Sequence, residues 1–348
     1  MFILAPAARP LVLMAMAFAI STGTMPGLVR LLRRTKMGKS IRDEASAPVM
    51  AALHKAKAGT PTMGGVVIWG AVLVLAVGLS AACAWFPSTL ACSLSFLSRR
   101  QTWLPLALMV GAALIGLIDD YFNVKRVGPN GGGLTVKHRL FSYTLIALIG
   151  AWWFTTKLGW DQLHVPFVGT YNIGLWYPLF FILTIVATSH SVNVTDGLDG
   201  LAGGSLLSAF GAYAAIAWSQ GRTDIATLCA AIIGGLIGFL WFNINPADVF
   251  MGDTGAMSLG TVLGVVALMT NQPFLLLIIG LPFVIESLSV LVQTLSKLLR
   301  KKKLFRSTPL HHHLEAIGWG EPKVVMRFWM ISFVVSGIGM VIALIDKV

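Results

Sequence analysis

The sequence predicts an all-α, polytopic integral membrane protein with about ten transmembrane helices, because apolar runs of about 20 residues recur along the whole chain. Its 348 residues are 56% hydrophobic and 11% charged, whereas about a quarter of the residues in a soluble domain are charged. The mean hydropathy is +0.79. We expect residues 1–348 to form a single transmembrane helical domain.

The expected spans follow from the length that crosses the hydrocarbon core. They lie near 11–32, 62–84, 103–120, 138–156, 174–191, 200–218, 226–243, 254–270, 274–297 and 324–345. We expect the first to be a retained helix, because its basic cluster follows the apolar run, unlike that of a signal peptide. At 158–175, alternating side chains with Gly and Pro punctuation predict a short hairpin on the outside.

Basic residues predict the orientation of the chain. Lys and Arg gather in the first, third and ninth connections, at 33–61, 121–137 and 298–323, and loops of this kind stay in the cytoplasm. Arg99 and Arg100 in the second connection oppose the trend weakly. Both termini are therefore expected outside. The net charge of +12 then indicates contact with membrane lipids, and we expect no nucleic-acid partner.

The three cysteines are too few and too scattered for a disulfide framework or a zinc site. Cys229 lies in an apolar run and is expected to pack as a small hydrophobic residue. Cys83 and Cys92 would be able to pair if both face an oxidising compartment.

Polar motifs gather at the expected cytoplasmic ends of the helices. They are Lys57–Gly65 (KAGTPTMGG), Asp119–Asp120, Asn193–Asp199 (NVTDGLD), Asn243–Gly255 (NINPADVFMGDTG) and Pro309–Glu315 (PLHHHLE). Several acids beside apolar helices favour a hard divalent cation with oxygen ligands, and phosphate as the remaining partner. We find no Walker loop and no Ser/His/Asp order, so phosphoryl transfer with Mg²⁺ fits better than ATP hydrolysis or acyl transfer.

Asp119 and Asp120 end the apolar run that begins near Trp103. Adjacent carboxylates at the C-terminal end of a helix repel each other and face the negative end of its dipole. They are therefore either a solvated helix end or part of a cation site. Successive helical residues differ in direction by about 100°, so we expect the two acids to do different jobs.

The other motifs also have two interpretations. Asp253 precedes a span and would serve as an N-cap in the simpler one. Asp196 and Asp199 are three residues apart, which predicts one shared helical face with Asn193. Glu286 lies in a span that Pro282 is expected to kink, and we interpret it as a satisfied interior acid rather than a catalytic one.

The basic motifs favour phosphate or carboxylate contacts. His311, His312 and His313 are consecutive, so their side chains diverge and are not expected to bind one ion together. Lys57 beside a Gly-Thr-Pro-Thr turn would place an ammonium group and hydroxyl groups near phosphate, although a lone lysine is weakly specific.

Together, KAGTPTMGG, IDDY, NVTDGLDGLAGG, FNINPADVFMGDTG and TPLHHHLEAIGW occur in the order of one family. From about Lys57 to Trp329 the chain resembles the phospho-N-acetylmuramoyl-pentapeptide transferase (MraY) family, within the polyprenyl-phosphate N-acetylhexosamine-1-phosphate transferase superfamily. The resemblance implies a multi-pass enzyme of the bacterial inner membrane, with its active site at the cytoplasmic face. It would use Mg²⁺ to transfer phospho-N-acetylmuramoyl-pentapeptide from its UDP derivative to undecaprenyl phosphate, giving lipid I and UMP.

The resemblance also implies roles for individual residues. The catalytic residues would be Lys57, Asp119, Asp120, Asp253, His311, His312 and His313, with Asp253 and Asp120 binding the metal. Substrate binding would involve Thr62, Lys137, Asn193, Asp196, Asp199, Asn243 and Phe250. A homodimer is one assembly to consider. Transfer of N-acetylglucosamine 1-phosphate and a transporter or flippase, suggested by the intramembrane Glu286, are the alternatives.

Overall fold

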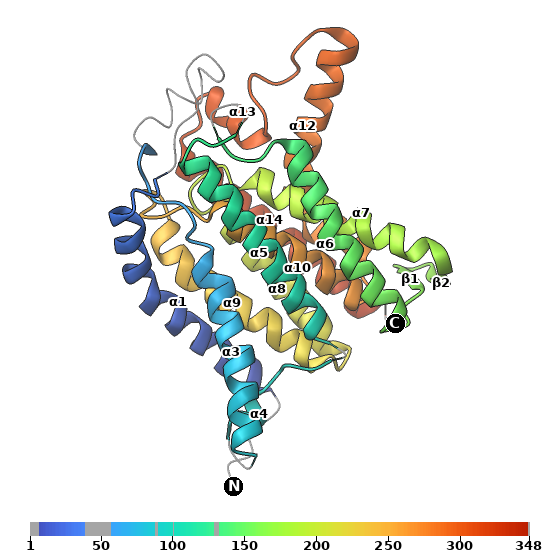
Figure 1. The fold of residues 1–348 in the computed structure, drawn as a ribbon. Helices are drawn as coiled ribbons and strands as arrows, with labels where there is room; N and C mark the ends of the chain where they lie inside the picture. Colours follow the sequence, from blue (N-terminus) through green and yellow to red (C-terminus); the bar gives the residue numbers. More distant parts are fainter. Residues whose placement is uncertain (1–6, 39–56, 88–89, 100, 129–131, 347–348) are drawn as a thin grey trace.

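A computed structural model describes residues 7–38, 57–87, 90–99, 101–128 and 132–346 and confirms the all-α membrane architecture (Figure 1). Segments 39–56 and 129–131 and Arg100 lie outside the described residues, with some of the basic residues that predict the orientation. Within the described part, nine helices are long and apolar enough to cross a membrane. They are Ala8–Arg34 (α1), Val66–Trp85 (α3), Trp103–Val124 (α5), Gly174–Thr195 (η3 and α7), Leu201–Ser219 (α8), Thr223–Asn243 (α9), Gly252–Met269 (α10), Leu281–Arg300 (α12) and Glu321–Ile345 (α14).

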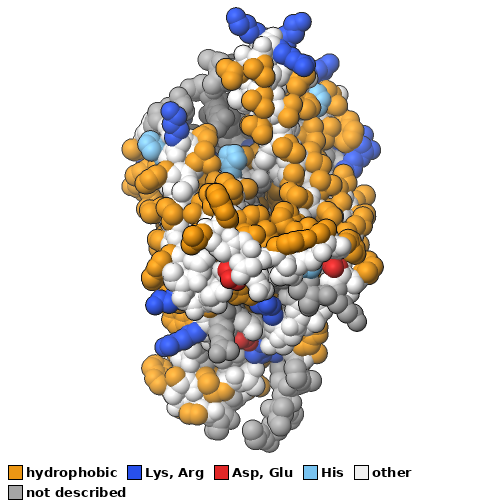
Figure 2. Space-filling view, turned by 90° about the vertical axis from the view of Figure 1, so that its right-hand side faces the viewer, with side chains coloured by type: hydrophobic (Ala, Val, Ile, Leu, Met, Phe, Trp, Pro, Cys, Tyr) orange, Lys and Arg blue, Asp and Glu red, His pale blue; other side chains and the backbone are white. Residues whose placement is uncertain are grey.

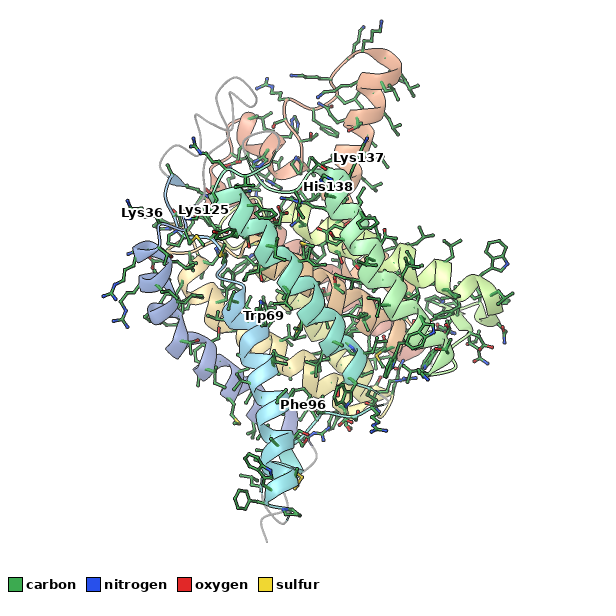
Figure 3. The ribbon with its side chains drawn as sticks, in the orientation of Figure 1. Lys36, Trp69, Phe96, Lys125, Lys137 and His138 are labelled. Atoms are coloured by element: carbon green, nitrogen blue, oxygen red, sulfur yellow. A yellow bond between two sulfur atoms is a disulfide. The ribbon has the colours of Figure 1, made fainter. Side chains whose placement is uncertain are left out.

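The remaining expected span, 138–156, also forms a helix, Val136–Thr156 (α6). It is not among those nine, and its first turn carries Lys137, His138 and Arg139. It runs alongside α5 in Figure 1. The polar first turn lies at the same end of the bundle as the C-terminal end of α5, where Lys125 is labelled in Figure 3.

The expected ninth span, 274–297, is divided in the structure. A turn of 3-10 helix at Pro273–Leu275 (η4) and the short helix Leu276–Ile279 (α11) precede Gly280, and α12 begins after it. Pro282 lies in the first turn of α12, where its missing N–H group removes no helical hydrogen bond. The interruption is therefore at Gly280 and not at Pro282, and the last turns of α12 stand clear of the other helices (Figure 1).

Helix α10 is the centre of the bundle. Almost every residue from Gly252 to Met269 is buried, and the helix packs against α3, α5, α7 and α8. Glycines permit the closest approaches. A Cβ atom on Gly65 would lie 2.3 Å from the Cα atom of Gly255, and one on Gly116 would lie 2.4 Å from the carbonyl oxygen of Asp253. Hence α5 and the segment before α3 meet the first turn of α10 directly.

The other end of the bundle carries the predicted hairpin and a disulfide between the two cysteines whose pairing the sequence left open. Strands Gln162–Val165 (β1) and Gly169–Asn172 (β2) pair antiparallel, with Gln162 opposite Asn172, which confirms the hairpin at 158–175. Cys83, near the end of α3, is bonded to Cys92 in the short helix Leu90–Leu94 (α4). The described C-terminal end reaches the hairpin, because Asp346 Oδ2 is 2.8 Å from His164 Nε2.

Candidate active site

The first feature of the site is a contact between Asp120 of α5 and the N-terminus of α10. Asp120 accepts hydrogen bonds from the backbone N–H groups of Asp253 at 3.0 Å and of Thr254 at 3.1 Å. These N–H groups have no partner within their own helix, and the helix dipole favours an anion there. Gly252 has a φ of +76°, and a Cβ atom on it would lie 2.5 Å from Asp120 Oδ2. Asp120 therefore fixes the first turn of α10, and with it the backbone of Asp253.

Asp119 faces a different set of partners, as adjacent positions on a helix require. Its Oδ1 accepts the N–H group of Leu134 at 2.6 Å, and its Oδ2 lies 2.6 Å from Arg139 Nε. That ion pair lacks the alignment of a hydrogen bond, so the buried Oδ2 atom has no hydrogen-bond donor among the described residues. Asp119 is itself fully buried. One backbone N–H donor and one nearby positive charge thus stabilise its carboxylate.

Arg139 and Asn193 hold the Asp253 side chain. Arg139 Nη2 donates to Asp253 Oδ2 at 2.8 Å, and Asn193 Nδ2 donates to Asp253 Oδ1 at 2.5 Å. Arg139 Nη1 also donates to Asn193 Oδ1 at 3.2 Å. The N-cap position of α10 is Met251, without a side-chain cap bond. The N-cap interpretation of Asp253 is therefore wrong, and its carboxylate belongs to what we call the arginine cluster, Asp119, Arg139, Asn193 and Asp253.

A second group, the lysine cluster, consists of Lys57, Asp199 and Glu321. Lys57 Nζ donates to Asp199 Oδ1 at 2.6 Å and also to Glu321 Oε1. Glu321 Oε1 accepts the backbone N–H group of Asp199 at 2.8 Å as well. Lys57 Nζ is 6.0 Å from the centre of the Phe250 ring. One ammonium group is thus held between two carboxylates beside an aromatic face.

The expected common face of Asn193, Asp196 and Asp199 is wrong. Helix α7 ends at Thr195, and Gly200 takes a left-handed conformation before α8 begins, so the sequence between them is a turn and not a continuing helix. Asn193 joins the arginine cluster and Asp199 joins the lysine cluster. Asp196 lies half-buried in the turn.

Two further expected site residues hold the backbone around the clusters. Asn243 is buried, accepts the N–H group of Gly200 at 2.9 Å and donates to the carbonyl of Val249 at 2.8 Å. Thr62 is buried, with its Oγ1 atom 3.5 Å from Asp120 Oδ1. The backbone of Phe250 bonds to Pro61 and Gly64 on both sides of Thr62. The segments KAGTPTMGG and NINPADVFMGDTG consequently lie side by side.

Lys137 is exposed in the first turn of α6, as Figure 3 shows. The residue that contacts the acids is Arg139, which the sequence reasoning did not single out. A signal for it exists, because Arg139 shares the helical spacing of the buried residues Tyr143, Ile146 and Gly150 on α6. Lys137 lies two positions earlier and therefore faces away from that side.

The three histidines have separate partners among the described residues. His311 is fully buried, with Nδ1 3.0 Å from Glu286 Oε2. His312 Nδ1 is 2.8 Å from Glu315 Oε2, and His313 Nδ1 accepts the N–H group of Arg306. Glu286 is thus the satisfied interior acid that we expected.

The helix that carries the histidines, Leu310–Ala316 (α13), reaches the turn between α7 and α8. A Cβ atom on Gly197 would lie 2.3 Å from His311 Nε2. That Nε2 atom is buried and has no hydrogen-bond partner in the part of the chain that the structure describes. His311 therefore faces the turn that contains Asp196 and Asp199.

Comparisons with known proteins show which family the sequence resembles. A model of glycosyl transferase family 4 matches residues 102–271, and the phospho-N-acetylmuramoyl-pentapeptide-transferase signature 1 matches residues 57–68. A phospho-N-acetylmuramoyl-pentapeptide-transferase of Geobacillus sp. is 40% identical over 331 residues, covering 94% of this chain and 95% of that protein. The chain belongs to the phospho-N-acetylmuramoyl-pentapeptide-transferase family. Proteins of that name from Bacillus anthracis and Chloroflexus aurantiacus are each 38% identical to this chain. The matched regions cover 97% of the first protein and 90% of the second.

The matched segments contain most of both clusters. The signature of the phospho-N-acetylmuramoyl-pentapeptide-transferase family includes Lys57 and Thr62, and the broader family model includes every residue of the arginine cluster. The histidines and Glu321 lie outside both matches. The contacts from Lys57 to Glu321 and from His311 toward Gly197 nevertheless attach them to the matched segments.

The arginine cluster fits a hard divalent cation by its chemistry. Among the described residues, no three His, Cys, Asp or Glu side chains form a metal-binding group. Two carboxylates and an amide oxygen nevertheless converge on a single cation, the Arg139 guanidinium. Oxygen ligands of this kind suit Mg²⁺, and within the described residues the buried Asp119 Oδ2 atom has no hydrogen bond to lose.

Proposed function

We propose that this protein transfers phospho-N-acetylmuramoyl-pentapeptide from UDP-N-acetylmuramoyl-pentapeptide to undecaprenyl phosphate, producing lipid I and UMP. A phosphate oxygen of the lipid attacks the phosphorus attached to the sugar, the bond from that phosphorus to UMP breaks, and UMP leaves. One diphosphate linkage replaces another. The observation that carries the proposal is the identity of about two residues in five, over nearly the whole length, with relatives named for this reaction.

The two clusters support this chemistry because they supply what a phosphoryl transfer needs. Such reactions depend on charge neutralisation and positioning more than on a special nucleophile. The second pKa of a phosphate monoester is about 6. The lipid phosphate is therefore largely deprotonated at neutral pH and is ready to attack as the nucleophile. Lys57 and Arg139 offer positive charge to the diphosphate, and Arg139 pairs with the buried Asp119 and the partly buried Asp253.

Mg²⁺ belongs to the proposal, with Asp253 as its principal ligand and Asp119 Oδ2 beside it. When bound, the ion would neutralise negative charge on the diphosphate. Asp120 does not bind the ion in this arrangement. It positions the first turn of α10 through two backbone hydrogen bonds. Direct ligation by Asp120, which the sequence led us to expect, is the alternative.

We place the nucleotide at the lysine cluster. The half-buried Phe250 ring offers a face for uracil, and Lys57 lies next to it. Asn193, Asp196, Asp199, Asn243 and Thr62 would bind or border the substrate. His311, His312 and His313 would contact its polar groups from α13, and Lys137 would meet phosphate or lipid headgroups from its exposed position.

We propose a multi-pass protein of the bacterial inner membrane, with the clusters facing the cytoplasm and both termini outside. Lys36, Lys125 and Lys137 lie at the end of the bundle that carries the site (Figure 3). Figure 2 shows Lys and Arg side chains at its upper tip, beyond a broad apolar surface, and others in its lower half; the group at the tip favours the cytoplasmic side. The chain would act as one helical domain, and a homodimer is the assembly to test by mass in detergent.

The deciding experiment is release of UMP by purified protein from two competing UDP-sugars, with and without Mg²⁺. We expect release from UDP-N-acetylmuramoyl-pentapeptide, dependent on Mg²⁺ and undecaprenyl phosphate, and loss of it in Asp253→Ala. Asp248→Ala is the matched control, because this nearby acid is 63% exposed. Preferential use of UDP-N-acetylglucosamine would reassign the substrate. Uptake into vesicles without any UMP release would instead favour a transporter.

A further inference from the structure

Arg139 occupies the position in which a cation would sit. Its guanidinium group lies 2.6 Å from Asp119 Oδ2 through Nε and 2.8 Å from Asp253 Oδ2 through Nη2. Two carboxylates therefore share one guanidinium group, which leaves the group of three with a formal charge of −1. Asp119 is fully buried and the Asp253 side chain is 15% exposed, so solvent screens this charge only in part.

The position and length of the Arg139 side chain allow its guanidinium group to move away from Asp119 and Asp253. It belongs to the first turn of α6, is 23% exposed and ends a long, flexible chain of single bonds. Its Nε contact with Asp119 lacks hydrogen-bond alignment. The guanidinium group can therefore move toward solvent without displacing its helix, and its fork of N–H donors matches the oxygens of a phosphate.

We propose that Arg139 is an internal counter-ion that competes with the divalent cation for Asp119 and Asp253. The part of this inference that concerns the diphosphate rests on the proposed function. A cation at the two carboxylates releases the guanidinium group, which is then available to the diphosphate of the substrate. Because coupling between two ligands is reciprocal, a bound diphosphate that holds Arg139 in its released position also tightens binding of the cation.

The direct test is titration of Mn²⁺ without any substrate, with the free ion followed by electron paramagnetic resonance. We expect Arg139→Gln to bind Mn²⁺ about tenfold more tightly than the unaltered protein, because a neighbouring positive charge has been removed. Lys125→Gln is the matched control, since it removes the same charge from an exposed position at the C-terminal end of α5. Its affinity should change less than about twofold, as expected for a screened charge. Unchanged or weaker binding in Arg139→Gln would overturn the proposal.

A second measurement uses the unaltered protein, in case the variant does not fold. Phenylglyoxal reacts with accessible guanidinium groups, and labelling at each arginine can be followed by peptide mass spectrometry. Mn²⁺ should accelerate labelling of Arg139 and leave Arg9 unchanged, because Arg9 pairs with Asp224 near the start of α9. Equal labelling of Arg139 with and without Mn²⁺ would refute the competition.

Failure of this proposal is distinguishable from failure of the proposed function, because neither measurement contains a UDP-sugar or lipid phosphate. Absence of UMP release would refute the transfer reaction and leave the competition to be decided by Mn²⁺ affinity. Absence of Mn²⁺ binding in both the unaltered protein and Arg139→Gln would refute the competition, whatever the protein transfers.

Discussion

Asp120 on α5 accepts the backbone N–H group of Asp253 on α10 at 3.0 Å. One acid of the site therefore fixes the backbone of another, while its neighbour Asp119 contacts Arg139. This arrangement separates positioning from charge neutralisation in two adjacent residues. It also leads to predictions that distinguish them.

Asp119→Asn and Asp120→Asn should both greatly reduce UMP release but differ in their dependence on Mg²⁺. Asp119→Asn removes a charge next to Asp253, so we expect it to need more Mg²⁺ for half-maximal rate. Asp120→Asn should change that concentration less and reduce stability by about 2 kcal/mol, because it weakens two charge-assisted hydrogen bonds. Identical Mg²⁺ titrations of the two variants would contradict the division of roles.

Gly252→Ala should disturb the same contact from the other side. The new methyl group would meet Asp120 Oδ2 at 2.5 Å, at a φ of +76°. Gly318→Ala is the control, because Gly318 also has a positive φ, but a methyl group there would meet no atom of the described residues within 4 Å. Both substitutions should reduce stability by about 1–2 kcal/mol through backbone strain. Only Gly252→Ala should also reduce UMP release, and equal activities would argue that Asp120 tolerates displacement.

Glu321→Gln should weaken the lysine cluster without removing Lys57. Glu321 is one of two carboxylates that hold the ammonium group, so its neutralisation leaves Lys57 less well positioned. We expect kcat/KM for the UDP-sugar to fall about tenfold, equivalent to about 1.4 kcal/mol, mainly through KM. Asp248→Asn, an exposed acid of the same charge, should leave KM unchanged. A change confined to kcat would contradict a role of Glu321 in substrate binding.

The buried Glu286 and His311 should be strongly coupled in stability. Removing one partner leaves the other buried polar group without its hydrogen bond, which costs about 1–3 kcal/mol, and Glu286 also accepts the backbone N–H group of His311. We expect Glu286→Ala and His311→Ala to be far from additive in a double-mutant cycle measured by denaturant unfolding. Glu286 and His313 have separate partners, so their cycle should be nearly additive. Additivity in both cycles would show that the pair contributes little.

Asp346 should make stability depend on acid pH. A hydrogen bond with the His164 side chain, followed by one from the Phe167 N–H group, lowers the pKa of Asp346 below its ordinary value. Its contribution is therefore complete above the ordinary carboxyl pKa of about 4 and is lost as pH falls through the lowered value. Asp346→Asn should be less stable than the unaltered protein at neutral pH and equally stable in strong acid. A constant difference across this range would contradict the assignment.

The spans and the hairpin were predictable because each depends on local composition and periodicity. The location of Asp119 and Asp120 near the C-terminal end of a helix, beside other acids, also follows from local patterns. Arg139 was missed in favour of Lys137, since the choice depends on which face of α6 is buried. The pair Lys57 and Glu321 is 264 positions apart in sequence, beyond any local pattern.

Two errors have specific local causes. The spacing of Asp196 and Asp199 predicts one helical face, but α7 ends at Thr195 and Gly200 turns the chain in a left-handed conformation. Pro282 in the ninth span suggests a kink, but a proline in the first turn of a helix fits without one, and the interruption is at Gly280. In both cases, the effect of the residues depends on where the neighbouring helix begins or ends, which the residue types alone do not determine.

The burial of α10 has a consequence for biosynthesis. The Asp120 side chain and the N–H group of Asp253 are 133 positions apart in the chain, so α5 is translated long before its partner. Until α10 has been translated, we expect the two carboxylates of α5 to lie at a membrane boundary, where unpaired charge is unfavourable. We therefore expect nascent α5 to keep this end in water until α10 arrives, so that docking of the central helix and assembly of the candidate active site are a single event.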